Sequence, residues 1–233
     1  MMGATLVALF ATAVVLHPLE LSLAPGALHP DQLAALTGRG GTLAVLGGMR
    51  SVVAGGFWLK ANLAWERHDA VATTGLIKLT VAADERPLYF WLNGARILAY
   101  DLPEWRLAGV APAAVRQKVR ADHARQALGF LEKGRHQHGD DAAFLIEMGN
   151  IHLRRTGDLE AAARCYRQAA ERPGAPSYAA RIHGELLRRL GRRAEALAWL
   201  RRILPGLPAD DPAARRDVVV ERIKLLEVEL AGK

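Results

Sequence analysis

Residues 157–169 read GDLEAAARCYRQA, and residues 191–203 read GRRAEALAWLRRI. The two stretches share one pattern: a glycine, an alanine-containing turn of helix, and then larger apolar side chains at helical spacing. Gly157 and Gly191 are 34 residues apart, and Ala162 and Ala196 have the same separation. A fixed internal period of this length is typical of repeat architectures. The sequence therefore predicts an all-α fold in which one helix pair is repeated.

Small residues occupy the positions where the paired helices would meet. A glycine inside a helix costs about 1 kcal/mol relative to alanine, so it usually has a packing reason. A glycine at a helix end can adopt a positive φ and stop the helix without strain. Alanine at the start of the second helix leaves room for a neighbouring helix. The residues predicted to set this packing are Gly149, Gly157, Ala162, Gly184, Gly191 and Ala196.

The pattern resembles the tetratricopeptide repeat (TPR) family over residues 50–208. The resemblance is clearest in the pairs 143–170 and 177–204, and Pro208 stands where such repeats often place proline. Upstream, Trp91-Leu92-Asn93-Gly94-Ala95 is similar to the opening of the family's repeat. A fainter copy covers residues 53–83. The whole layout resembles small bacterial membrane-anchored TPR proteins.

This resemblance implies a TPR-like right-handed α-solenoid of antiparallel helix pairs. In the family, the first helices of successive pairs line a concave groove that holds a peptide or a partner's helix. Asparagine can fix a peptide backbone through its amide, and arginine can bind a carboxylate through two hydrogen bonds. The alternative is that the same side chains form a solvated polar surface. The implied groove residues are Arg96, Asn150, Arg154, Arg181, Glu185 and Arg188.

The chain divides into five predicted segments. They are an N-terminal hydrophobic anchor helix at 1–24, a linker with a short helix at 25–48, degenerate helical repeats at 49–110, TPR-like repeats at 111–208 and a C-terminal capping helix at 209–233. Within them, helices are expected at 70–83, 87–100, 111–135, 142–155, 158–171, 176–190 and 193–204. In the last segment, Asp211 is expected to cap a helix that begins at Pro212.

The apolar run Met1–Leu16 has no charged side chain and ends at His17-Pro18. It is shorter than the roughly 20 residues that span a bilayer, although apolar residues continue beyond Pro18. An uncleaved membrane anchor, a cleaved secretory signal and a helix buried in the protein all remain open. No basic residue precedes the run, which weakens the signal interpretation. The anchor interpretation places the protein in the inner membrane with its repeats on the periplasmic side, and the cytoplasmic side stays open because few basic residues flank the run.

The net charge of +7 falls on residues 111–233, since the remainder of the chain is balanced. An anionic partner is therefore favoured over a cationic one. This supports a second hypothesis, a soluble basic repeat protein that binds nucleic acid or another anion through its paired arginines. Such binding would weaken steeply with salt. The interleaved acidic residues argue against nucleic acid, so a protein partner is preferred.

The sequence contains no phosphate-binding loop, nucleophile elbow or His-Glu-x-x-His motif. The segment 135–141 (RHQHGDD) has metal-binding side chains, but it is interpreted as an inter-repeat turn in which Asp141 caps the next helix. His152 and His183 could face the groove, although packed or surface histidines are the preferred interpretation. Cys165 is interpreted as a small buried residue. The chain is thus expected to be non-enzymatic, with no cofactor.

Overall fold

The computed structural model describes residues 49–109, 111–139, 141–208 and 211–232. The chain forms two units, residues 1–50 and 51–233, and the description below concerns the second. All regular elements in the described ranges are helical, without any strand among them, which confirms the all-α prediction. The predicted anchor at 1–24 and the short helix of the linker lie outside the described residues. Across the described ranges, helices that combine the length and the apolar character needed for a bilayer crossing are absent.

The helices follow the predicted boundaries to within two residues, apart from two differences reported below. The α-helices are α4 Arg50–Glu66, α5 Ala70–Ala83, α6 Leu88–Arg96, α7 Leu102–Arg106, α8 Ala113–Gln137, α9 Ala142–Ile151, α10 Leu159–Ala170, α11 Ser177–Arg189, α12 Arg193–Ile203 and α13 Arg216–Ala231. Short π or 3₁₀ elements join some of them: η1 Ile97–Asp101, η2 His152–Thr156, η3 Leu204–Gly206 and η4 Pro212–Ala214.

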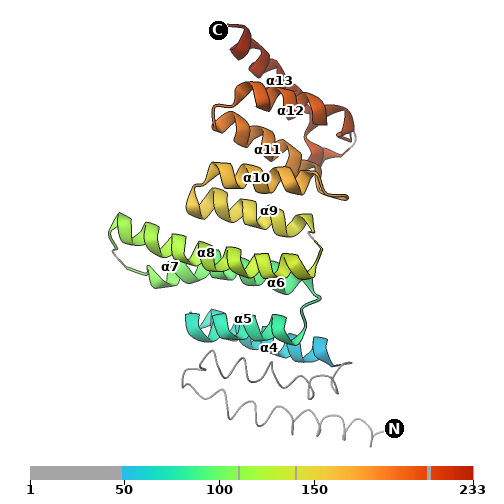
Figure 1. Ribbon diagram of the computed structural model, residues 1–233. Coiled ribbons are helices and arrows are strands. Elements are labelled where there is room, and N and C mark those ends of the chain that lie inside the picture. Colours follow the sequence, from blue (N-terminus) through green and yellow to red (C-terminus); the bar gives the residue numbers. More distant parts are fainter. Residues whose placement is uncertain (1–48, 110, 140, 209–210, 233) are drawn as a thin grey trace, which may run out of the picture. The chain divides into compact units, whose positions relative to one another are not determined.

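Consecutive helices pack against each other from α9 to α13 (Figure 1). The contact between first and second helices is close at the two interior glycines. A Cβ atom on Gly149 would lie 2.9 Å from the ring of Tyr166, and one on Gly184 would lie 2.6 Å from Cδ2 of Leu200. Neither distance is possible for a real Cβ contact, so only glycine allows this approach.

The two pairs also share one turn. Gly157 and Gly191 end the first helices with φ of 71° and 76°, in the left-handed region that glycine adopts without strain. Ala162 and Ala196 are fully buried at the start of the second helices. Asp141 accepts a hydrogen bond from the Ala143 N–H, which confirms its predicted role as a helix cap.

The upstream helices also approach each other closely at glycines. A Cβ atom on Gly94 of α6 would lie 2.7 Å from Ile77 of α5. One on Gly134 of α8 would lie 2.6 Å from Phe144 of α9 and 2.7 Å from the Trp91 indole of α6. These two glycines therefore hold α5, α6, α8 and α9 at close range.

Residues 101–110 lie between the predicted helices 87–100 and 111–135, and the structure makes most of them helical. The first helix of this pair continues through η1 into α7 and ends at Arg106. Pro103 has no N–H to donate, and just before it the helix widens to π geometry, in which the Leu102 N–H donates to the Ile97 carbonyl. Burial of Leu102 and Pro103 against the neighbouring helices keeps the extra turn in place.

The last helix also begins later than predicted. Asp211 accepts a hydrogen bond from the Ala213 N–H, but the turn it caps is the 3₁₀ element η4. Arg215 then adopts φ of 46°, and α13 starts at Arg216. The break inserts Ala214, fully buried, into the core formed by α11, α12 and α13. The apolar stripe of α13 lies against that core, with Val219, Ile223 and Leu226 buried and Leu230 half-buried.

Candidate functional site

The six predicted groove residues lie on α6, α9, η2 and α11, the first helices of successive pairs. We call these six side chains the first-helix face. Their partners divide them into two classes: some are neutralised by a carboxylate, and others have donors to spare.

Arg96 belongs to the first class. Its Nε and Nη2 donate to Oε2 of Glu147 at 3.0 and 2.9 Å. Glu147 is only 3 % exposed, so this ion pair neutralises a buried carboxylate. Arg96 therefore joins α6 to α9, and its charge is not available to a ligand in full.

A second cluster, which the sequence did not predict, fixes the end of the same helices. Arg155 donates to Oε1 of Glu104 at 2.9 Å and to the Tyr100 carbonyl at 3.1 Å. Its guanidinium also lies 4.6 Å from the centre of the Tyr100 ring. Hydrogen bonds from Arg120 and then from Arg155 lower the pKa of Glu104, which stays ionised. This cluster holds η2 against α7 and makes the first-helix face rigid at its edge.

Asn150 is oriented by the second helix of its own pair. The Tyr166 hydroxyl donates to Oδ1 of Asn150 at 2.7 Å. Tyr166 is 2 % exposed, and burial raises its pKa to about 12, so the hydroxyl keeps its proton and can donate. Among the described residues, nothing accepts a hydrogen bond from the Asn150 Nδ2 group. The amide is thus held in place with its two N–H donors unused.

Arg154 and Arg181 form no hydrogen bond or ion pair with any other described residue. The charge of Arg154 acts to lower the pKa values of both Tyr100 and Tyr166, against the larger effect of burial. The Nε atom of Arg181 is buried and has no partner. Leaving a buried donor unsatisfied costs about 1–3 kcal/mol, so an acceptor supplied at this point would bind favourably.

Glu185 and Arg188 pair with each other along α11, with Nη2 and Oε1 2.6 Å apart. The hydrogen bond from Arg188 is the main cause that lowers the pKa of Glu185. Arg222 of α13 lies 3.5 Å from the other carboxylate oxygen of Glu185. The pair therefore links α11 to α13 and marks the end of the first-helix face.

The structure thus places three side chains with unused donors, Asn150, Arg154 and Arg181, between two neutralised groups. The Glu185–Arg188 pair was visible in the sequence from its spacing of three. The pairing of Arg96 with Glu147 was not, because 51 residues separate them.

The paired arginines of the nucleic-acid hypothesis are mostly bound to carboxylates. Arg192 contacts Glu160 and Glu195, and the remaining ion pairs are Arg188–Glu185, Arg193–Glu229 and Arg201–Glu227. Surface pairs of this kind contribute little stability, but they reduce the positive potential that a nucleic acid would meet.

In the part of the chain that the structure describes, the histidines and Cys165 have no reactive arrangement. His183 is 5 % exposed, and its Nδ1 lies 2.9 Å from the Ala163 carbonyl, so it packs against the second helices and not on the first-helix face. Burial lowers the pKa of His152 and raises the pKa of the Cys165 thiol to about 11. A thiol with such a pKa is a poor nucleophile at neutral pH. Within the described ranges, side chains that could ligate a metal do not gather in groups of three.

No protein-family model matches this chain, and a search of curated proteins finds no match.

Proposed function

We propose that the chain is a TPR-like right-handed α-solenoid that acts as a non-enzymatic scaffold, binding a segment of a partner protein on its first-helix face. Three features support the proposal: the 34-residue period, the same glycine turn in both clear pairs, and the sequential packing of α9 to α13. The apolar run at 1–16 supports a tether to the inner membrane, with the repeats on the periplasmic side, in the assembly or support of a protein complex.

One observation supports the proposed location of the binding site. Asn150, Arg154 and Arg181 have unused hydrogen-bond donors, on a face whose other charged groups are neutralised. A rigid amide with two free N–H donors suits a backbone carbonyl. Two guanidinium groups without counter-ions suit a carboxylate. We therefore expect an extended peptide segment whose backbone contacts Asn150 and whose acidic side chain, or free C-terminus, contacts the arginines.

The expected energies are sufficient for specific binding. A hydrogen bond to a charged group contributes about 1.5–3 kcal/mol, and each 1.4 kcal/mol changes the affinity tenfold. Removing one arginine should thus weaken the complex about tenfold or more, provided that the carboxylate is excluded from water in the complex.

The test is a library of synthetic peptides screened by fluorescence polarisation against the full chain. Peptides with a carboxylate should bind, and the Arg154→Gln/Arg181→Gln variant should lose at least about tenfold in affinity. The control is Arg67→Gln/Arg125→Gln, which removes the same charge from two exposed arginines, one in the turn after α4 and one on the second helix α8.

Equal loss in both variants would mean that net charge, and not this face, governs binding. Binding of single-stranded nucleic acid in preference to any peptide, with a steep salt dependence, would replace the scaffold proposal by the basic-repeat alternative.

A further inference from the structure

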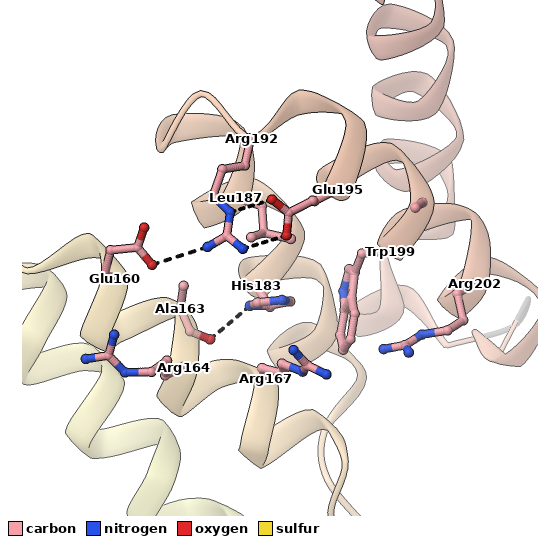
Figure 2. Close-up of a pocket in the computed structure, with 11 residues that line it drawn as sticks. Glu160, Ala163, Arg164, Arg167, His183, Leu187, Arg192, Glu195, Trp199 and Arg202 are labelled. Carbon is pink, nitrogen blue, oxygen red and sulfur yellow. Dashed lines mark hydrogen bonds and ion pairs between the residues drawn. The ribbon is translucent and has the colours of Figure 1, made fainter.

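A cavity of about 460 Å³ lies between α10, α11 and α12, and it contains none of the six predicted groove residues. Its walls come mainly from the second helices α10 and α12, with His183 and Leu187 of α11 between them (Figure 2). We call it the second-helix cavity. It is separate from the first-helix face in residues and in chemistry.

One side of the second-helix cavity is occupied by a closed set of ion pairs. Arg192 contacts Glu160 of α10 at 3.3 Å and also contacts Glu195 of α12. These contacts link α10 to α12, and both carboxylates that line the cavity are engaged in them. Figure 2 shows this bridge apart from Arg167 and Arg202.

Three further arginines line the cavity and are only partly neutralised, and in Figure 2 Arg164 lies below Glu160, whereas Arg167 and Arg202 lie near Trp199. Arg164 has no hydrogen bond or ion pair in the described part of the chain. Arg202 lies 4.3 Å from the centre of the Trp199 ring and contacts no carboxylate there. Arg167 shares an exposed pair with Glu171 at 3.1 Å, a contact that water screens. With Arg192 and the two glutamates, the lining of the cavity carries a net charge of +2.

Between these arginines lies a fixed wall of two rings. The Nδ1 of His183 lies 2.9 Å from the Ala163 carbonyl, which can only accept, so this nitrogen carries the proton. Burial lowers the pKa of His183 and keeps the ring neutral at pH 7. Trp199 packs edge-on against it at 4.4 Å, and its Nε1 donates to the Ala180 carbonyl. The wall therefore has a defined shape and adds no charge.

We propose that the second-helix cavity binds a phosphomonoester, with the phosphate held by Arg167 and Arg202. A phosphate monoester carries a charge of about −1.5 to −2 at pH 7 and three acceptor oxygens, which suit two guanidinium groups in a lining with a surplus of positive charge. A carboxylate has one charge and two oxygens, so it satisfies this set less completely. The His183–Trp199 wall offers contact to the organic part of the ester.

The phosphate ester could belong to a phosphorylated side chain of a protein or to a small molecule, and a binding experiment separates these sources. Isothermal titration calorimetry of the full chain at pH 7.5 should give a Kd below about 1 mM for phenyl phosphate. Benzoate should bind at least about tenfold more weakly. A phosphoserine peptide that binds more tightly than phenyl phosphate would identify a protein source, and the reverse order would identify a small molecule.

The decisive variant is Arg167→Gln/Arg202→Gln, with Arg67→Gln/Arg125→Gln as the charge-matched control. The cavity variant should lose at least about tenfold in affinity for phenyl phosphate, whereas the control should change less than twofold. Since Arg167 and Arg202 are exposed, the fold should survive, and the single Arg202→Gln variant provides a second test.

Equal affinity of the cavity variant and the wild type, or equal affinity for benzoate and phenyl phosphate, would overturn the proposal. Peptide binding on the first-helix face should be unchanged in the cavity variant. The failure of one site is therefore distinguishable from the failure of the other.

Discussion

Two glycines of the same helix should respond to alanine in opposite directions. In α8, a Cβ atom on Gly134 would lie 2.6 Å from Phe144 and 2.7 and 2.8 Å from two atoms of the Trp91 indole. Phe144 is fully buried and Trp91 is 5 % exposed, and neither aromatic ring can bend away. Gly129 is exposed, and its Cβ would meet nothing within 4 Å.

The expected magnitudes follow from two competing effects. Alanine favours a helix over glycine by about 1 kcal/mol, and this gain applies at both positions. Overpacking costs about 1–3 kcal/mol at Gly134 only, and the contact with two rigid rings favours the upper part of that range. Gly129→Ala should thus stabilise the chain by about 1 kcal/mol, and Gly134→Ala should destabilise it by about 1–2 kcal/mol.

Urea denaturation followed by circular dichroism measures both changes. The two variants should differ by about 2–3 kcal/mol, which corresponds to about 4–12 °C in Tm for a chain of this size. Equal stabilities of Gly129→Ala and Gly134→Ala would refute the argument that α6, α8 and α9 meet at this point.

Three further variants test the packing and the ion pairs. Ala196→Phe should destabilise the chain by about 1–3 kcal/mol, because Ala196 is fully buried. The control Ala194→Phe should not destabilise it, because Ala194 is exposed. Equal melting curves for the two variants would exclude this arrangement of α12. Arg96→Ala should lower the free energy of unfolding, measured by urea denaturation, by about 1–3 kcal/mol, because it leaves the buried Glu147 carboxylate unpaired. Adding Glu147→Gln should recover part of this loss, and no recovery would contradict the pairing. Hydrogen bonds, chiefly from Arg86, hold the pKa of Asp84 well below its usual 3.8, so the ionised carboxylate stabilises the folded chain fully above pH 4 and less as the pH falls. The difference in unfolding free energy between wild type and Asp84→Asn should therefore disappear in acid. A constant difference from pH 7 to pH 2 would disprove the stabilising role of this carboxylate.

The helices could be predicted from the sequence because their signals are local. Each clear pair has a glycine that ends the first helix and an apolar spacing that defines the second, and Asp141 marks a helix start. Such signals depend on the backbone conformation of a few consecutive residues, so they can be recognised without knowing which other helices pack nearby.

The errors arose where tertiary contacts decide the local structure. The π turn before Pro103 persists because Leu102 and Pro103 are buried by other helices. The left-handed residue Arg215 is stabilised by the insertion of Ala214 into the core. Trp65 is 39 % exposed, and its indole N–H donates to Asp101 at 2.7 Å. Local sequence contains no trace of these distant partners.

The same limit applies to the candidate site. The resemblance implied six residues on the first helices, but it could not show that Arg96 is neutralised and that Arg181 is not. The second-helix cavity was missed as well. The paired arginines of residues 188–202 were considered as a nucleic-acid surface, and only the structure separates those paired with glutamate from Arg202.

A double-mutant cycle on the peptide complex tests the central claim most directly. The affinity of a bound acidic peptide and of its amide analogue is measured for the wild type and for Arg181→Gln. A direct contact predicts a coupling energy of about 1.5–3 kcal/mol between Arg181 and the carboxylate. A coupling energy of zero, with both peptides losing the same affinity in the variant, would contradict binding on the first-helix face.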